Sequence, residues 1–361
     1  MRILHVVGAR PNFMKVAPVM SALGKRPETW QILIHTGQHY DASLSDAIFE
    51  QLGLPAPDVN LGAGSASHAR QTAAIMVGLE GCFEKYAPDL VLVYGDVNST
   101  AAATLVAVKM GIRCGHVEAG LRSGDRTMPE EINRLVTDRL ADLLFTPSAD
   151  ADENLIREGV DPTRVFRVGN VMIDTLIRLL PASDGASILR RLPPPAEGWD
   201  RFVLVTLHRP SNVDHERVLA GLMTALGELS RDAPVIFPMH PRTRTRLRNG
   251  NWQQPGLHVT EPLGYLEFLG LERTASLVVT DSGGVQEETT YLGVPCLTVR
   301  ENTERPITVS MGTNTLVGKD PDRMLAAART ILRGEGKRGS VPPLWDGQAA
   351  GRIAAILAGA M

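Results

Sequence analysis

The chain of 361 residues is long enough for two domains at roughly 100–200 residues each, and each domain can hold a full core. Lys and Arg number 37 against 40 Asp and Glu; a formal net charge of −3 without a charged block argues against a nucleic-acid-binding surface. Aromatic residues make up only 5% of the chain, which favours parallel sheets covered by helices over a β-sandwich.

The cysteines and the N-terminus bear on the cellular compartment. Cys82, Cys114 and Cys296 lie far apart in apolar stretches and lack the spacing of metal ligands. We therefore expect buried free thiols, no metal site and a reducing, cytoplasmic location. The apolar run in residues 1–8 is too short for a signal peptide or a membrane span, and no other segment reaches about 18 apolar residues.

Short apolar runs alternate with helical stretches in the first half of the chain. Buried strands are predicted at residues 3–7, 31–36, 90–94, 113–117, 143–147 and 164–168. Helices are predicted at residues 14–24, 43–52, 66–86, 99–110 and 129–141. This alternation is typical of a parallel, doubly wound sheet.

The same alternation restarts after the loop at residues 181–200, which contains three consecutive prolines at 193–195. Strands are predicted at residues 202–206, 234–239, 257–260, 277–280 and 296–299, and helices at 213–231, 265–274, 285–292 and 321–333. The last segment, 347–360, is helical and is expected to pack back across the first domain.

These elements predict an α/β protein of two Rossmann-like domains facing a cleft. The N-terminal domain comprises residues 1–168 plus 348–361, and the C-terminal domain comprises residues 169–347. A ligand is expected in the crevice at the carboxyl ends of the strands.

The first candidate site follows the first strand, in the run GARPNFMK at residues 8–15. Gly8 permits a tight turn, the next helix offers free N–H groups, and Arg10 and Lys15 add cationic donors for an anion. Taken alone, the run favours an ordinary strand–helix turn with two exposed cations, because no complete GxGxxG motif is present.

Three acidic positions follow strands of the same predicted sheet. Asp96 lies between a buried strand and a helix that residues 98–100 can cap, which leaves its carboxylate for acid–base or positioning work. Glu118 is flanked by small residues, and it is either paired with Arg122 or an acid–base group with a raised pKa. Glu130 either stabilises the start of a helix or adds a third carboxylate for stepwise proton transfer.

The second half carries a possible nucleotide site. His208 follows the first strand of its domain, and either makes structural hydrogen bonds or holds a phosphate and moves a proton. The run TDSGGVQEE at residues 280–288 joins a strand to a helix. Its backbone amides at residues 282–284 suit a diphosphate, and Glu288 suits the two hydroxyls of a ribose. Arg305 is a candidate charge partner for the diphosphate.

Together these segments resemble the non-hydrolysing UDP-N-acetylglucosamine 2-epimerases over nearly the whole chain. The most specific runs are HVEAGLR at residues 116–122, PEEINR at 129–134 and DSGGVQEE at 281–288. The resemblance implies the two-domain fold of the glycosyltransferase B type. It also implies interconversion of UDP-GlcNAc and UDP-ManNAc by anti elimination of UDP to 2-acetamidoglucal and re-addition of UDP, with no cofactor and no metal.

The resemblance also assigns roles to residues. The implied catalytic residues are Asp96, Glu118, Glu130 and His208. The implied substrate-binding residues are Arg10, Lys15, Arg134, Phe268, Ser282, Gly283, Gly284, Glu288 and Arg305. It further implies a homodimer in contact through helices of the N-terminal domain, with a UDP-sugar as the small-molecule partner and no nucleic acid or membrane.

Several alternatives stay open at this point. One alternative is a sugar with other substituents, because some relatives epimerise a UDP-diacetamido-uronic acid. A hydrolysing 2-epimerase would release ManNAc, and more distant options are a glycosyltransferase of the same fold or a nucleotide-sugar sensor. Residues 38–41 and 126–128 differ from the forms typical of members with a second, regulatory UDP-GlcNAc site, so allosteric control is left undecided.

Overall fold

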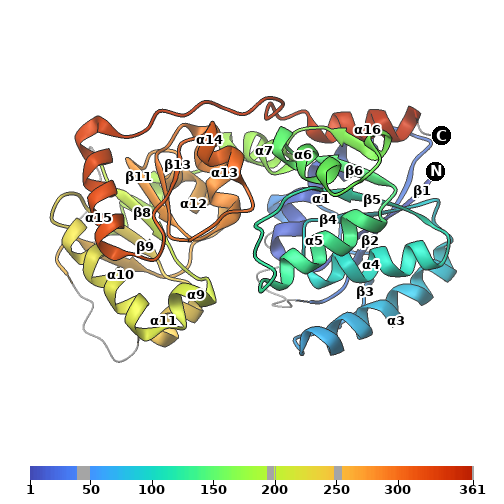
Figure 1. Ribbon diagram of the computed structural model, residues 1–361, viewed down its shortest axis with the longest axis horizontal. Helices are drawn as coiled ribbons and strands as arrows, with labels where there is room; N and C mark the ends of the chain where they lie inside the picture. The colour runs from blue at the N-terminus through green and yellow to red at the C-terminus, as the bar shows by residue number, and fades with distance from the viewer. Residues whose placement is uncertain (39–48, 193–198, 200, 248–253, 360–361) are drawn as a thin grey trace. The chain divides into compact units, whose positions relative to one another are not determined.

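The structure, a computed structural model, describes residues 1–38, 49–192, 199, 201–247 and 254–359. It divides into two compact units (Figure 1). Unit 1 comprises Met1–Thr175 and Pro343–Met361, and unit 2 comprises Leu176–Pro342. The chain therefore leaves unit 1, forms all of unit 2 and returns.

Unit 1 is built on a parallel seven-stranded sheet. Its strands are β1 (Arg2–Val7), β2 (Trp30–His35), β3 (Val59–Asn60), β4 (Leu90–Tyr94), β5 (Arg113–Val117), β6 (Leu143–Thr146) and β7 (Val165–Arg167). The strand order is β3-β2-β1-β4-β5-β6-β7, so the direction of winding reverses between β1 and β4. This reversal is the topological switch point at which open α/β sheets bind ligands.

Helices cover the sheet of unit 1. They are α1 (Arg10–Leu23), α3 (His68–Tyr86), α4 (Asn98–Lys109), α5 (Pro129–Leu140), α6 (Ala149–Arg157), the short η1 (Pro162–Arg164) and α16 (Ala349–Gly359). Helices α3, α4 and α5 lie side by side, and α16 packs against α1 (Figure 1). Helix α7 (Val171–Leu179) carries the chain out of unit 1.

The C-terminal segment is held in unit 1 by buried hydrogen bonds. The Asp174 carboxylate accepts the backbone N–H groups of Ala349 at 3.1 Å and Ala350 at 2.7 Å, which caps α16. The indole Nε1 of Trp345 donates to the carbonyl of Pro147 at 3.0 Å. The segment after Pro343 therefore completes the core of unit 1.

Unit 2 repeats the plan with a parallel six-stranded sheet in the order β10-β9-β8-β11-β12-β13. Its strands are β8 (Val203–Thr206), β9 (Val235–Pro238), β10 (Leu257–Thr260), β11 (Leu277–Thr280), β12 (Cys296–Thr298) and β13 (Asn314–Leu316). Its helices are η2 (Leu180–Ala182), α8 (Ala186–Leu189), α9 (Pro210–Val213), α10 (Glu216–Leu229), α11 (Pro241–Arg246), α12 (Tyr265–Glu272), α13 (Gly283–Leu292), α14 (Pro306–Ser310), α15 (Pro321–Thr330) and η3 (Ile331–Glu335).

The cores explain why these runs form strands. Strand β4 has the sequence LVLVY and is buried along its whole length, as expected for a strand covered by helices on both faces. In unit 2, Val203 and Val205 pack in one apolar cluster, whereas Leu204 packs in another on the opposite face of the sheet.

The predicted fold class of two Rossmann-like α/β units is confirmed. The predicted strands match the observed ones within one or two residues, but β3 and β13 were not predicted, because two or three residues carry no apolar run. The predicted helix 213–231 is wrong at its start, since α9 ends at Val213 and α10 begins at Glu216. Most of the predicted helix 43–52 and the prolines at 193–195 lie outside the described residues.

None of the helices in the described ranges is both long enough and apolar enough to cross a membrane.

Candidate functional site

The turn after β1 is tied to the end of β4 by Asn12. The Asn12 Oδ1 accepts the N–H groups of Gly8 at 3.0 Å and Ala9 at 3.1 Å, and its Nδ2 donates to the Tyr94 carbonyl at 2.8 Å. These two amides, which precede α1, are therefore occupied, and the predicted N–H donors of the helix itself stay a prediction. Arg10 stands exposed at the first residue of α1.

Lys15 forms a buried ion pair with Glu118. The Lys15 Nζ lies 2.7 Å from the Glu118 Oε2, and the two side chains are 5% and 3% exposed. Gly95 makes room for the ammonium, because a Cβ at that position would lie 2.7 Å from the Nζ. The candidate acid–base group after β5 thus has a fixed positive partner.

The alternative that Glu118 pairs with Arg122 is wrong. The Arg122 guanidinium contacts the Asp138 carboxylate at 2.7 Å and the Glu158 carboxylate at 2.8 Å. Glu118 itself has a φ of +77°, in the left-handed region that costs a non-glycine residue about 1–2 kcal/mol. Such strain is found where the surrounding structure holds a functional side chain in place.

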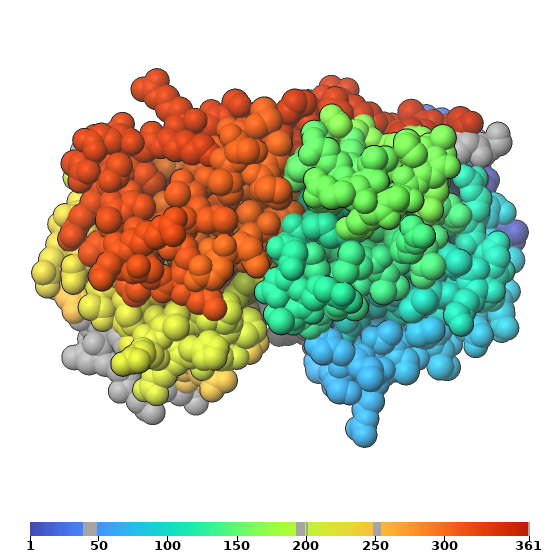
Figure 2. All heavy atoms as spheres, in the orientation of Figure 1, coloured from blue at the N-terminus to red at the C-terminus, as the bar shows by residue number. Residues whose placement is uncertain are grey.

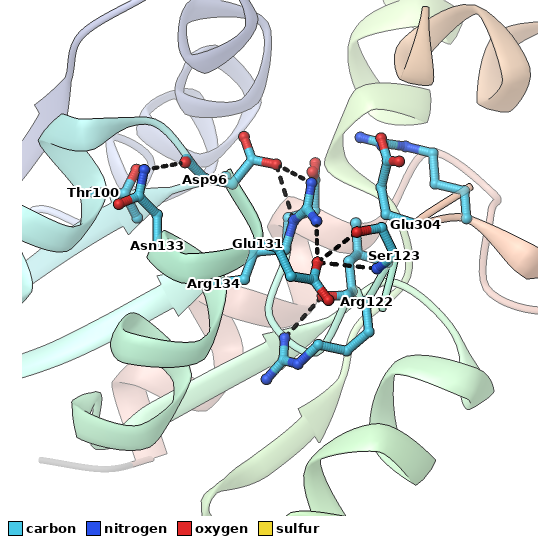
Figure 3. Close-up of polar contacts among 12 residues, drawn as sticks. Asp96, Thr100, Arg122, Ser123, Glu131, Asn133, Arg134 and Glu304 are labelled. Carbon is cyan, nitrogen blue, oxygen red and sulfur yellow. Dashed lines mark hydrogen bonds and ion pairs between the residues drawn. The ribbon is translucent and has the colours of Figure 1, made fainter. Parts of the chain in front are cut away.

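Asp96 follows β4 and is held by Arg134 of α5 (Figure 3). The Arg134 Nη2 and Nε donate to the Asp96 Oδ2 at 2.6 and 3.0 Å, and Nη1 donates to the Glu131 Oε2 at 2.6 Å. Arg134 is buried, whereas 23% of the Asp96 side chain is exposed. The guanidinium therefore fixes a carboxylate that solvent or a ligand can still reach.

As the sequence indicated, Asp96 is not needed to cap α4. The prediction that side chains of residues 98–100 cap this helix instead is wrong. The N-cap residue of α4 is Val97, without a side-chain cap. Instead, the Gln38 Oε1 accepts the N–H of Ser99 at 3.1 Å and its hydroxyl at 2.8 Å.

The neighbouring acids of α5 have different surroundings. Burial alone would raise the pKa of Glu131, but the amides of Ser123 and Gly124 and the Arg134 guanidinium outweigh it and lower that pKa. Glu130 is half-buried, and no group in the described part of the chain forms an ion pair or hydrogen bond with it. Glu131 is therefore structural, while Glu130 is available to a ligand.

His116 and Asp138 form a buried network that the sequence analysis missed. The His116 Nδ1 lies 2.6 Å from the Asp138 Oδ1, and its Nε2 lies 2.7 Å from the Gly95 carbonyl. The Asp138 Oδ2 also accepts the N–H of Gly120 at 3.0 Å. Burial raises the pKa of Asp138, but His116 and Arg122 reverse that effect and lower it. The sequence signal that could have identified this network is Asp138, an acid on the buried face of α5.

In unit 2, His208 is oriented by Asp281, a second residue that was not singled out. The fully buried Asp281 carboxylate accepts the N–H groups of His208 at 3.0 Å and Arg209 at 2.9 Å, and lies 3.0 Å from the His208 Nδ1. Burial raises the pKa of Asp281, but the hydrogen bonds and charge of His208 outweigh it and lower that pKa. Because Nδ1 is anchored, Nε2 is the ring nitrogen left to meet a ligand.

The run at residues 282–284 starts helix α13 beside Arg305. Gly283 is required there, since a Cβ would lie 2.5 Å from the Arg305 Nη1. Arg305 is 7% exposed, its Nε lies 2.9 Å from the Glu287 Oε1, and its Nη1 contacts the Glu304 carboxylate. The predicted diphosphate partner is thus a buried arginine held between two carboxylates.

The remaining predicted contacts of unit 2 lie around helix α12. The Glu288 Oε1 accepts the hydroxyl of Tyr265 at 2.8 Å, and Glu288 is 4% exposed. Phe268 is partly buried against an apolar cluster of unit 2 that includes Leu271 of the same helix. A further acid, Glu272, is fully buried beside Glu288 and was not predicted.

A surface cavity of about 580 Å³ lies in unit 1. Its lining comes from α3, α4, α5 and the loop before α5, and consists of His68, Ala69, Thr72, Ala73, Met76, Asn98, Arg126, Thr127, Pro129, Ile132 and Asn133. The Asn133 Nδ2 also donates to the Asp96 carbonyl at 2.9 Å, so one wall of the cavity supports the Asp96 loop.

Comparison with known proteins agrees with the resemblance. A model of the UDP-N-acetylglucosamine 2-epimerase family matches residues 21–358. The UDP-N-acetylglucosamine 2-epimerase of Methanocaldococcus jannaschii is 41% identical over 99% of both chains. The crystal structure of the M. jannaschii UDP-GlcNAc 2-epimerase in complex with UDP-GlcNAc and UDP gives a TM-score of 0.87 at 40% identity over 99% of both chains.

A relative with another named substrate is similar at almost the same level. The UDP-2,3-diacetamido-2,3-dideoxy-D-glucuronate 2-epimerase of Pseudomonas aeruginosa is 40% identical over 99% of both chains. Both relatives are epimerases, and the family model spans nearly the whole length of this chain. The chain therefore belongs to the UDP-N-acetylglucosamine 2-epimerase family, a family of isomerases.

Proposed function

We propose that this protein interconverts UDP-N-acetylglucosamine and UDP-N-acetylmannosamine by inverting C2 of the sugar. The observation that carries the proposal is the placement of Asp96 and Glu118 after the adjacent strands β4 and β5, each paired with a cation. Glu130 adds a carboxyl group at the start of α5 that has no ion-pair partner among the described residues. The names of the family model and of the 41% identical relative favour this sugar over the diacetamido-uronate.

The chemistry requires a base, an acid and a stabilised leaving group. The C2–H bond is weakly acidic, so a carboxylate base removes the proton while the C1–O bond breaks and UDP leaves with the bonding electrons. This gives 2-acetamidoglucal with a C1–C2 double bond. UDP then adds back at C1 while C2 receives a proton on the opposite face, so the two half-reactions need proton-transfer groups on both faces.

The residues of unit 1 supply the proton-transfer groups in this proposal. Glu118 and Asp96 are the carboxylates that accept a proton in this proposal, and their ion pairs with Lys15 and Arg134 hold them in place. Glu130 has no such partner among the described residues and suits the role of a proton donor. Arg134 contributes to substrate binding in this proposal by holding Asp96 in place.

The residues of unit 2 hold the nucleotide in this proposal. The start of α13 provides the amides of Gly283 and Gly284 for the diphosphate, since the Ser282 N–H already donates to the Thr280 hydroxyl at 2.9 Å. The oriented Nε2 of His208 protonates or binds the leaving phosphate. Glu288 accepts the ribose hydroxyls, and Phe268 contacts the nucleoside. Arg305 contributes charge to the diphosphate. Arg10 and Lys15, both in α1 of unit 1, are further proposed substrate contacts.

The test is to incubate the protein with UDP-GlcNAc in deuterated water and follow C2. The expected result is UDP-ManNAc together with deuterium at C2 of both nucleotide sugars. Free ManNAc and UDP as the main products would instead identify a hydrolysing epimerase. Turnover of the UDP-diacetamido-glucuronate alone would reject the proposed sugar, and no exchange with either substrate would reject epimerisation.

We also propose that the protein is a homodimer in the cytoplasm. Helix α3 lies at the surface of unit 1 (Figure 2), where Val77 is 72% exposed, and Ile132 of α5 is 38% exposed beside the surface cavity. These apolar groups support a contact surface. The three free, buried thiols support a reducing compartment. Light scattering of the wild type and of Val77→Glu tests the dimer; equal masses for both at the monomer value contradict it.

A further inference from the structure

Glu272, the last residue of α12, is a carboxyl group enclosed in the interior of unit 2. Its side chain is fully buried, and neither of its oxygens accepts a hydrogen bond from any group within the described ranges. Two of the elements that pack on α12, η2 and α8, have the sequences LPA and ASIL and carry no titratable side chain. The titratable groups that act on Glu272 come from other elements and are Glu288 of α13 and the Cys296 thiol of β12. An ionised carboxylate in such a place would pay a large desolvation cost.

The polar group that faces Glu272 is another carboxyl group, Glu288 of α13. Burial first, and then the charge and hydrogen bond of Glu288, raise the pKa of Glu272 well above its ordinary value. Glu288 differs from Glu272 because the Tyr265 hydroxyl donates to its Oε1 at 2.8 Å. Two adjacent carboxyl groups share one proton when only one of them has an outside donor, so Glu272 is the neutral acid of the pair.

We propose that Glu272 is a positioning residue whose carboxylic acid donates a hydrogen bond to Glu288 and orients the Glu288 carboxylate toward the hydroxyl pair of a bound ribose. This inference rests on the proposed function for its ligand, UDP. With donors from Glu272 and Tyr265, the carboxylate keeps lone pairs for two ribose hydroxyls. The shared proton also limits the pair to one negative charge, which reduces repulsion of the diphosphate.

The test compares UDP with 2′-deoxy-UDP by titration calorimetry, since the second ligand lacks one of the two hydroxyls. In the wild type, UDP should bind more tightly. Glu272→Leu should weaken UDP about 10-fold, the loss expected for a hydrogen bond to a charged group, and leave the affinity for 2′-deoxy-UDP nearly unchanged. Glu272→Gln keeps an N–H donor and should retain the wild-type ratio of the two affinities.

Two controls separate positioning from a general structural role. Glu267→Gln removes a partly exposed charge from the same helix and should leave the affinity ratio unchanged. The melting temperature of Glu272→Leu should equal or exceed that of the wild type, because leucine replaces a buried acid that lacks other donors. A folded Glu272→Leu protein that keeps the wild-type ratio, or that weakens both ligands equally, overturns the inference.

The outcomes also separate this inference from the proposed function. UDP affinity is measured without turnover, whereas epimerisation is measured by deuterium at C2. A wild type that exchanges C2 deuterium but shows no preference for UDP over 2′-deoxy-UDP rejects the Glu272–Glu288 inference alone. A wild type with the preference, lost in Glu272→Leu, but without C2 exchange supports the inference and rejects the proposed reaction.

Discussion

Lys15 and Glu118 form an ion pair of 2.7 Å, although Lys15 belongs to the first helix of the chain and Glu118 follows the fifth strand. Both side chains are at most 5% exposed. Removing one member of a buried pair leaves an uncompensated charge in a poorly solvated place. The placement of the candidate base therefore depends on a residue far from it in the sequence.

Replacing Lys15 with methionine is expected to impair the candidate base, Glu118, although Glu118 itself is unchanged. Without the ammonium, the Glu118 carboxylate loses the contact that holds it in place, so turnover should fall about 10²-fold or more. The free energy of unfolding should fall by about 3–5 kcal/mol. Steady-state rates and urea denaturation measure the two effects.

The double variant Lys15→Met/Glu118→Gln is the matched control. It carries no buried charge at this position, so most of the lost stability should return, whereas turnover should stay low. Wild-type turnover in Lys15→Met would show that Glu118 does not need its ion pair with Lys15 to act as the base.

The positive φ of Glu118 predicts an unusual order of stability among its variants. Glycine adopts a φ of +77° without strain, but alanine does not. Glu118→Gly should therefore be more stable than Glu118→Ala by about 1 kcal/mol in urea denaturation. Equal stabilities, or a more stable alanine variant, would mean that the backbone carries no strain there.

The adjacent acids of α5 should respond differently to the same substitution. Glu130→Gln should reduce turnover about 10²-fold and leave the melting temperature unchanged, because no described group pairs with Glu130. Glu131→Gln should lower the melting temperature, since Glu131 accepts three hydrogen bonds from Ser123 and Gly124 and pairs with Arg134. The reverse pattern would assign the proton transfer to Glu131.

Asp174 predicts a pH dependence of stability. Burial, the largest effect, raises its pKa from 3.8 to about 6. Between these values the unfolded chain has lost the proton while the folded chain keeps it, so stability contributed by Asp174 falls as pH rises from about 4 to 6. The loss should reach about 2–3 kcal/mol.

Urea denaturation of the wild type and of Asp174→Asn at pH 4 and pH 7 checks this prediction. The unfolding free energy at pH 7 minus that at pH 4 should be more negative for the wild type than for Asp174→Asn, because other groups contribute equally to both proteins. The same pH dependence in both proteins would show that Asp174 titrates normally.

Much of the fold follows from local pattern. Runs such as LVLVY in β4 are apolar along their whole length, and a strand buried on both faces needs no other signal. The strands β3 and β13 are too short to carry a pattern, and they form because a neighbouring strand offers its backbone groups. The break at Asp214 between α9 and α10 likewise depends on tertiary contacts, including its ion pair with Arg242.

The sequence predicts where the acidic residues of the candidate site lie in the fold, but not which cations pair with them. Parallel strands end at one edge, so Asp96 and Glu118 could be placed there from sequence alone. Arg122 was the nearest cation to Glu118 along the chain, yet packing brings Lys15 to it instead. Glu272 stands at the end of a short helix, where an acid is usually solvated, and only the packing of other elements of unit 2 around α12 makes it interior.

The return of the chain at Pro343 has a consequence for synthesis. Ribosomes deliver the N-terminal part first, and domains tend to fold as they emerge. Unit 2 has its full sequence before α16 exists, so the unit that begins the protein is the last to be finished. Until then Asp174 lacks the amides of Ala349 and Ala350, and α1 lacks its covering helix. A nascent chain stalled before Pro343 would hold one completed unit and one with every strand in place but an open flank, a target for chaperones.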